Sequence, residues 1–315
     1  MDSIEVSIIC DAYNQVKYIG DALDSMLAQR TTFQFEILVH DDASTDGTAD
    51  VIASYAKKYP DVVKPYYEST NQYTIGAPHN FLVQKARIKG RYIALCEGDD
   101  YWTDPQKLQA QFEILEAHKE LDICVHAGER VQADTKKSMG IVRPCKHDCI
   151  IPVEEVIAGG GGFVVTNSIF MRTETYVNPP DIVAKFNLDF MVQIWGSMRG
   201  GMYYIDRSMS AYRIERLDSW TNTISRSAVK ALSFLELVIN SLTLLDEQTA
   251  FAYTEPLQIH IDELNYQRYA YQGNYSRIFN TKKWKTLPPH AKIKAIPHIL
   301  SSRISYIIDV WRSAR

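Results

Sequence analysis

Short apolar runs alternate with amphipathic stretches over the first hundred residues. The runs VSIIC (6–10), FEILV (35–39) and YIALC (92–96) are typical of buried strands, and helical patterns fall at 17–29 and 46–58. This alternation predicts βαβ units and a largely parallel sheet. A helix capped by Asp104 with Pro105 at its first position follows, and strand candidates up to about residue 215 favour a mixed sheet there.

The strand signal stops beyond Ser219, and three helical stretches follow at roughly 226–246, 255–279 and 291–312. We therefore expect a catalytic domain at 1–220 and a helical extension at 221–315. The segment 282–315 holds eight Lys or Arg against one acid, Asp309, so its net charge is +7 and the rest of the chain carries −11.

Apolar residues of this basic segment recur every three or four positions, so basic and apolar faces separate on one helix, with a kink expected at Pro297. Such a tail predicts peripheral contact with an anionic membrane. An oligomer contact, or packing on the catalytic domain, remains open as an alternative. The recurring positions are Ile293, Ile296, Leu300, Ile304, Ile307 and Trp311.

The composition is that of a globular chain, since 46% of its 315 residues are hydrophobic and 23% are charged. A net charge of −4 provides no general basic field, which argues against a nucleic-acid partner.

Three of the five cysteines lie in apolar runs and are expected to be buried free thiols in a reducing compartment. Residues 145–149 (CKHDC) have no second ligand pair for zinc. An acidic start and the lack of a run of 18 apolar residues predict a cytoplasmic chain that is neither exported nor membrane-spanning by itself.

Two acidic motifs follow predicted strands. In DDASTDG, Asp41 and Asp42 stand at the carboxyl edge of the sheet, where ligands bind in open α/β folds. Turn chemistry is the simpler interpretation, with an Asx turn at either Asp and with Ser44 or Thr45 capping the next helix.

In EGDD, Glu97, Asp99 and Asp100 surround Gly98, which permits close backbone approach. This grouping favours a hard divalent cation and its phosphate-bearing ligand over a solvated acidic loop, because a strongly apolar strand precedes it.

These motifs, together with VSIICDAYNQ at the first strand, resemble the nucleotide-sugar glycosyltransferases of the GT-A fold, in particular glycosyltransferase family 2. The resemblance covers roughly residues 4–215, and YIALCEGDDYWTDPQKL is similar to bacterial enzymes that build capsule and lipopolysaccharide glycans. It implies an α/β, Rossmann-like fold in which a mixed, mostly parallel sheet is flanked by helices, here with a C-terminal helical extension.

The resemblance also assigns roles to residues of the first half. It implies that Tyr13 stacks on the nucleotide base and that Asp42 accepts from the base imide, which selects uracil over cytosine. Asp99 would contact the ribose or sugar, and Asp100 would ligate Mn²⁺ or Mg²⁺. Asp11 is a further donor-binding candidate, at a position where the family often has a small polar residue.

In the second half, FNLDFMVQIW matches the place of the family's general base and implies that role for Asp189, which could instead be a helix N-cap. MSAYRIERLDSW resembles an element near the diphosphate and implies donor binding by Arg213. Glu215 stands where His is common, and a carboxylate there could ligate the metal. His79 would lie near the donor or be merely solvated.

The expected activity is therefore metal-dependent, inverting transfer of a hexose or N-acetylhexosamine from a UDP-sugar to a hydroxyl of a growing surface polysaccharide or lipid-linked glycan. A non-catalytic nucleotide-sugar or glycan binding protein is the main alternative. A sugar-phosphate nucleotidyltransferase is less favoured, because CDAYNQVKYIG lacks the Gly-rich basic loop that triphosphate requires.

Overall fold

The computed structural model describes the chain except for residues 1–2, 73–78, 182, 184–187, 215–226 and 314–315. The chain forms two compact units, Met1–Ile214 and Glu215–Arg315. The expected boundary after residue 220 falls within 215–226, outside the described residues.

The first unit is built on one sheet whose strands run in the order β3-β2-β1-β4-β9-β6-β10-β5. Its first four members are parallel, as the alternation of apolar and amphipathic segments predicts. Their apolar runs are nearly continuous because helices cover both faces of the sheet. These strands are β1 (Ile4–Ala12), β2 (Gln34–Asp41), β3 (Val63–Tyr67) and β4 (Tyr92–Leu95).

The rest of the sheet is mixed. β10 runs parallel to β6 and antiparallel to β5 and β8, and β9 runs antiparallel to both β4 and β6. The β10–β5 pairing places the end of β10 beside the loop that follows β4. These strands are β5 (Tyr101–Trp102), β6 (Ile123–Gln132), β7 (Ser138–Val142), β8 (Cys149–Ile151), β9 (Phe170–Arg172) and β10 (Met202–Ile214).

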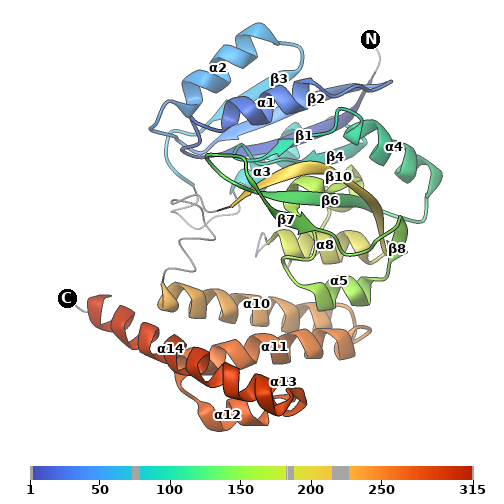
Figure 1. Ribbon diagram of the computed structural model, residues 1–315. Helices are drawn as coiled ribbons and strands as arrows, with labels where there is room; N and C mark the ends of the chain where they lie inside the picture. Colours follow the sequence, from blue (N-terminus) through green and yellow to red (C-terminus); the bar gives the residue numbers. More distant parts are fainter. Residues whose placement is uncertain (1–2, 73–78, 182, 184–187, 215–226, 314–315) are drawn as a thin grey trace. The chain divides into compact units, whose positions relative to one another are not determined.

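Helices α1 (Ile19–Leu27), α2 (Thr48–Lys58) and α4 (Lys107–Ala117) lie on one face of the sheet, and α8 (Asp189–Ser197) lies on the other (Figure 1). α3 (His79–Arg87) packs on β2, and α6 (Thr173–Val177) packs on β4 and β9. α5 (Val153–Gly159) packs on α8, and the 3-10 turn η2 (Thr166–Ser168) precedes β9. Fully buried aliphatic residues of β1, β2 and α1 dominate the main core.

Two expected helix caps are wrong. α4 begins at Lys107 with Gln106 as its N-cap, while the Asp104 carboxylate accepts from the Gln106 backbone N–H in the preceding turn. The N-cap of α2 is Gly47, whose φ of 98° is a conformation that L side chains rarely adopt. Ser44 and Thr45 therefore serve the loop rather than the helix.

The second unit is helical, as expected, but the helix predicted at 255–279 is interrupted. α11 ends at Gln272, and Gly273 with a φ of 68° turns the chain into a short following helix. The helices are α10 (Ala228–Gln248), α11 (Thr254–Gln272), α12 (Tyr275–Asn280), α13 (Lys282–Thr286) and α14 (Pro289–Ser313).

Among the described residues, α10 is the one helix long and apolar enough to cross a membrane. This is weak evidence for a span, because the core helix of a globular unit meets the same criteria. Leu232, Leu235, Leu242 and Leu245 of α10 are buried within the structure. The expectation of a chain without a membrane span therefore stays a prediction.

Candidate active site

Acidic residues from three neighbouring strands meet at the carboxyl edge of the parallel sheet. Asp11 is paired in register with His40 of β2, and Asp42 follows directly after that strand. The loop that carries Glu97 follows β4, which pairs with β1 through Ile9 and Leu95. Three separate sequence motifs thus form one constellation, as expected for parallel strands.

The loop after β4 is fixed tightly against the first strand. The Gly98 N–H donates to the Asp11 carbonyl at 3.0 Å, and the Asp100 N–H donates to the Glu97 carbonyl at 3.0 Å. A Cβ on Gly98 would lie 2.4 Å from Oε1 of Gln15. A larger residue here would force the Gln15 and Ile19 side chains to shift, so glycine lets the loop pack closely on the first strand.

Asp100 faces the protein interior, where its side chain receives hydrogen bonds on both oxygens. The Arg213 backbone N–H donates to Oδ1 at 2.8 Å, and the Asn167 amide donates to Oδ2 at 3.1 Å. Asp100 is 1% exposed, and Asn167 is fully buried. Asp99 is only half-buried. The two adjacent aspartates therefore occupy different environments, and Asp99 is the more exposed of the two.

Arg213 also lies inside the protein, with 1% of its side chain exposed. Its guanidinium donates to the Asp99 carbonyl at 2.6 Å, pairs with Asp21 and lies 4.5 Å from the centre of the Tyr101 ring. These contacts fix the acidic loop on the side that faces the protein interior. The geometry thus supports a positioning role, whereas the sequence resemblance implied direct donor binding.

Asp189 lies at the start of α8 and faces the acidic edge. The N-cap of this helix is Leu188, so the N-cap interpretation of Asp189 is wrong. The Asp189 carboxylate instead accepts a hydrogen bond from the Thr166 hydroxyl, with 2.6 Å between Oγ1 and Oδ2. Its side chain remains exposed to solvent.

The electrostatics connect Asp189 with the acidic loop. The pKa of Glu97 is well above its usual value, chiefly because burial disfavours its charge and then because Asp189, Asp99 and Asp100 repel it. The pKa of Asp189 is also raised. Loss of hydration among the surrounding protein atoms is the main cause, and Asp11 adds repulsion, while the Thr166 hydrogen bond acts in the opposite direction. These carboxylates therefore form one electrostatically coupled site.

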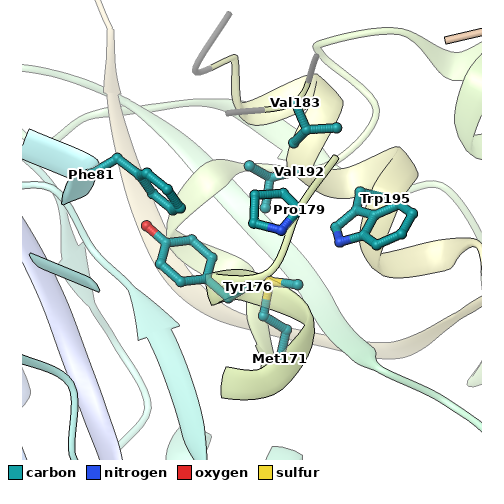
Figure 2. A pocket seen from close by; sticks show the side chains of 7 residues that line it. All are labelled: Phe81, Met171, Tyr176, Pro179, Val183, Val192 and Trp195. Carbon is teal, nitrogen blue, oxygen red and sulfur yellow. The ribbon is translucent and has the colours of Figure 1, made fainter. Parts of the chain in front are cut away.

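An apolar cluster anchors the helix that carries Asp189. Figure 2 shows Phe81 of α3 next to Tyr176, and Val192 and Trp195 of α8 on the other side of that tyrosine, with Pro179 between Tyr176 and Trp195. The Phe81 and Tyr176 rings meet edge to face at 5.4 Å, and the Trp195 indole N–H donates to the Thr175 carbonyl at 3.0 Å. The enclosed space is only about 10 Å³, which is room for one water at most. The cluster therefore positions α8 rather than binding a substrate.

The remaining donor-binding candidates lie at the ends of β1 and β2. Tyr13 is 43% exposed, which leaves a ring face available for stacking. Asp42 is half-buried, and its Oδ1 accepts from the Gln72 backbone N–H at 2.6 Å. Asp41 is buried and makes the turn instead, accepting from the Ser44 N–H at 3.1 Å.

Asp11 is held by two neighbours at the same edge. The Gln84 amide donates to its Oδ1 at 3.1 Å, and Nδ1 of His40 lies 3.8 Å from the same oxygen. Glu215 lies outside the described residues, as does the side chain of His79, although His79 begins α3.

Thr166 and Asn167 are site residues that the sequence analysis missed. They lie in η2, a three-residue turn that joins α8, β10 and the acidic loop through side-chain hydrogen bonds. The only sequence signal is three consecutive polar residues, Thr166, Asn167 and Ser168, inside the apolar run FVVTNSIFM. That signal does not distinguish a site residue from a buried structural amide.

Within the described part of the chain, no group of three or more His, Cys, Asp or Glu side chains is arranged to hold a metal ion by itself. The chemistry of the site nevertheless fits a hard divalent cation, because carboxylates gather here closely enough for Asp189, Asp99 and Asp100 to add, after burial, to the raised pKa of Glu97. Mg²⁺ is commonly held by one or two carboxylates together with substrate phosphates. Such a cation would then depend on a phosphate-bearing ligand.

Known proteins resemble this chain in sequence and in fold. The model of the family described as Glycosyl transferase family 2 matches residues 7–170. An uncharacterized protein of Mycobacterium tuberculosis is 35% identical over 216 residues, which cover 68% of this chain and 60% of that protein. The chain thus spans less than two thirds of the length of this curated relative.

Two solved structures share the fold. S. aureus TarS in complex with UDP-GlcNAc has a TM-score of 0.61 at 16% identity, covering 95% of this chain and 81% of that one. A mannosyltransferase from Pyrobaculum calidifontis in complex with GDP-Man and Mn²⁺ has a TM-score of 0.53 at 14% identity, covering 98% and 87%. The expected GT-A fold, a mixed sheet flanked by helices with a helical C-terminal region, is confirmed.

Proposed function

The chain belongs to glycosyltransferase family 2, and from this premise we propose that it is a metal-dependent, inverting glycosyltransferase. It moves a hexose or N-acetylhexosamine from a UDP-sugar to a hydroxyl of a growing surface polysaccharide or lipid-linked glycan in the bacterial cytoplasm. The observation that carries the proposal is the convergence of Asp11, Glu97 and Asp99 on one edge, electrostatically coupled to Asp189 on α8.

Asp189 is the proposed general base. Its carboxylate is solvent-accessible and is held by Thr166, so it can approach the acceptor hydroxyl in a fixed orientation. Its raised pKa increases its affinity for a proton above that of an ordinary aspartate. In the reaction, the acceptor hydroxyl gives its proton to Asp189 as the acceptor oxygen bonds to the anomeric carbon. The bond from that carbon to the diphosphate breaks on the opposite side, which inverts the configuration.

The donor is proposed to lie along the ends of β1, β2 and β4. Tyr13 would stack on uracil, and the half-buried Asp42 carboxylate would accept from the imide N–H. Asp11 and Asp99 are further donor contacts. Arg213 fixes the backbone of Asp99 from the interior and so acts as a positioning residue.

Asp99 is the described residue best suited to hold Mn²⁺ or Mg²⁺ together with the donor phosphates. Asp100, which the resemblance implied as the ligand, already accepts from two buried donors, and Glu215 remains a candidate ligand. When bound, the cation would neutralise the negative charge that develops on the departing diphosphate. Asp100 would then contribute by fixing the loop that presents Asp99.

Ligand-dependent melting of the full chain tests this function. UDP, UDP-glucose and UDP-N-acetylglucosamine should raise the melting temperature, and Mn²⁺ or Mg²⁺ should increase the shift, because a ligand that binds only the folded state stabilises it. Release of UDP from one of these sugars, with opposite anomeric configuration in the NMR spectrum of the product, would establish the reaction. A chain that no UDP-sugar stabilises, with either metal, would contradict the proposal.

A further inference from the structure

The last helix of the second unit, α14, has two apolar faces. One face packs on α10 and α11 through Ile299 and Ser302, which are buried, and through the half-buried Ala295. It meets Tyr266 and Ala270 of α11 in a small hydrophobic core. This face accounts for the attachment of α14 to its own unit.

The opposite face carries a row of large aliphatic side chains in solvent. Their spacing of three or four residues places them about 150° around the helix from the packed face, at roughly 100° per residue. The row extends over residues 293–308, which is about 22 Å of helix at about 1.5 Å per residue. Its members are Ile293 (70% exposed), Ile296 (45%), Leu300 (46%), Ile304 (57%), Ile307 (51%) and Ile308 (43%).

An exposed row of this length is unusual for a globular protein surface. Single exposed aliphatic residues need no explanation, whereas a contiguous apolar patch marks an interaction surface. Nothing among the described residues covers this row, since each of its six members is more than a third exposed. α14 also continues through Pro297 as one helix, so the row is not divided into separate segments (Figure 1).

Positive charge flanks the row. Lys292 and Lys294 lie on either side of Ile293, and the segment 282–315 carries eight Lys or Arg with Asp309 as its one acid. Asp309 is turned toward the inside of the unit, where it accepts from the Ala228 backbone N–H at 2.6 Å. The exposed side of α14 is therefore apolar along its centre, with Lys292 and Lys294 on its two borders near the start of the helix.

This combination selects one class of partner. A second copy of the chain would bring an equally basic segment against this one, so the two flanks would repel each other. An anionic lipid surface offers the complementary charge and an apolar interior at the right depth. We propose that α14 lies flat on an anionic membrane, with its aliphatic row in the boundary between headgroups and acyl chains and its lysines at the headgroups.

The docking surface would bring the catalytic unit close to an acceptor carried by a lipid. It is independent of the sugar-transfer chemistry, because none of its residues belongs to the sheet-edge site. Failure of the membrane proposal would therefore leave the proposed function intact. A chain that binds UDP but no vesicles would contradict only the membrane proposal.

Co-sedimentation of the full chain with lipid vesicles tests the proposal. Vesicles of equal parts phosphatidylglycerol and phosphatidylcholine should bind the chain at least about tenfold better than pure phosphatidylcholine, and salt should weaken the binding. The double variant Leu300→Ser/Ile304→Ser should lower the binding by more than about tenfold without changing the melting temperature, because both side chains are exposed. Lys292→Gln/Lys294→Gln should lower it severalfold and reduce its salt dependence.

Ile259→Ser is the matched control, since Ile259 is an aliphatic residue of α11 that is 40% exposed and lies outside the row. It should leave vesicle binding unchanged. Absence of binding to the anionic vesicles, or equal binding to both compositions, would overturn the proposal. So would a dimer in light scattering that the Leu300/Ile304 variant dissociates, because the row would then be an interface between copies.

Discussion

The hydroxyl of Thr166 donates a hydrogen bond to the carboxylate of Asp189, although 23 residues separate the two in sequence. The contact holds the side chain of a residue that begins a helix, and it lowers the pKa that partial loss of hydration and Asp11 raise. Transfer of a sugar to a neutral hydroxyl requires a group that accepts the hydroxyl proton, and a fixed orientation and increased proton affinity suit Asp189 to that role. This relationship makes Asp189 the residue to test first.

Asp189→Asn should reduce turnover by about 10² to 10⁴ because the amide cannot accept the acceptor proton. The amide keeps the size of the side chain and can still accept from Thr166, so the fold and donor binding should remain. Turnover with a UDP-sugar, UDP affinity by calorimetry and the melting temperature together measure these effects.

Asp50→Asn provides the control for this variant, because Asp50 is an exposed aspartate in the first turn of α2. It should behave as wild type in all three measurements. Turnover close to wild type in Asp189→Asn would assign the base role elsewhere, and Glu97 and Glu215 would be the next residues to replace.

Asn substitutions at Asp99 and Asp100 should have different consequences. Asp99→Asn should remove the increase in UDP affinity that Mn²⁺ provides, with little change in stability, because Asp99 is only half-buried. Asp100→Asn should destabilise the fold by about 1 to 3 kcal/mol, since it replaces a buried charge that accepts from Arg213 and Asn167. Calorimetry with and without Mn²⁺, and urea unfolding, separate the two effects.

The reverse pattern would contradict this assignment. If Asp100→Asn kept wild-type stability and lost only the Mn²⁺ effect, Asp100 would be the metal ligand that the sequence motif implied. Full activity of the wild type in excess EDTA would show that transfer needs no metal, and neither Asp99 nor Asp100 would then be a metal ligand.

Replacement of Asp42 should weaken UDP binding specifically. Asp42→Ala removes the carboxylate proposed to accept from the uracil imide, which should cost about 1.5 to 3 kcal/mol of binding free energy. CDP and GDP should bind wild type more weakly than UDP and should be less affected by the substitution. Calorimetric titration of all three nucleotides measures this, and tighter binding of GDP or CDP to wild type would rule out the uridine assignment.

The sequence predicted the parallel half of the sheet well because its signals are local. Each apolar run and each helical period from β1 to β4 can be recognised within about ten residues. The edge of a parallel sheet then brings Asp11, Asp42 and Glu97 together without further information. Fold class and the approximate position of the site therefore follow from short-range patterns.

The features that could not be predicted from the sequence depend on contacts between residues far apart in the chain. Which aspartate of the DD pair faces inward depends on β10, whose Arg213 N–H reaches Asp100 only because β10 pairs with β5. The caps of α2 and α4 were wrong because several residues near each helix start could serve, and tertiary contacts select among them.

The burial of Lys107 is a further feature that the local sequence pattern did not indicate. As the first residue of α4 it would normally be solvated, yet it is fully buried, and its Nζ has no hydrogen-bond partner among the described residues. The ammonium lies 4.2 Å from the centre of the Trp102 ring. Burial lowers the pKa of Lys107 from 10.5 to about 7, and the neighbouring Cys96 and Cys124 act in the opposite direction.

Stability should therefore depend on pH through Lys107. Between pH 7 and 10.5 the unfolded chain holds a proton at this lysine that the folded chain lacks, so the free energy of unfolding should rise with pH by up to about 1.4 kcal/mol per unit. Below pH 7 the penalty of burying the charge is complete, and above 10.5 it is absent. Lys107→Met should remove this contribution and stabilise the fold near pH 7 by about 2 to 4 kcal/mol, after loss of the contact with Trp102.

Urea unfolding of wild type and Lys107→Met from pH 6 to 10 measures the difference between the two stability curves, which cancels the titration of other groups such as the buried thiols. That difference should be largest near pH 7 and shrink as the pH rises. Lys57→Met, at an exposed lysine in the last turn of α2, should give a curve parallel to wild type. Parallel curves for Lys107→Met as well would mean that Lys107 stays charged in the folded protein, because the attraction of the Trp102 ring would then offset the loss of hydration.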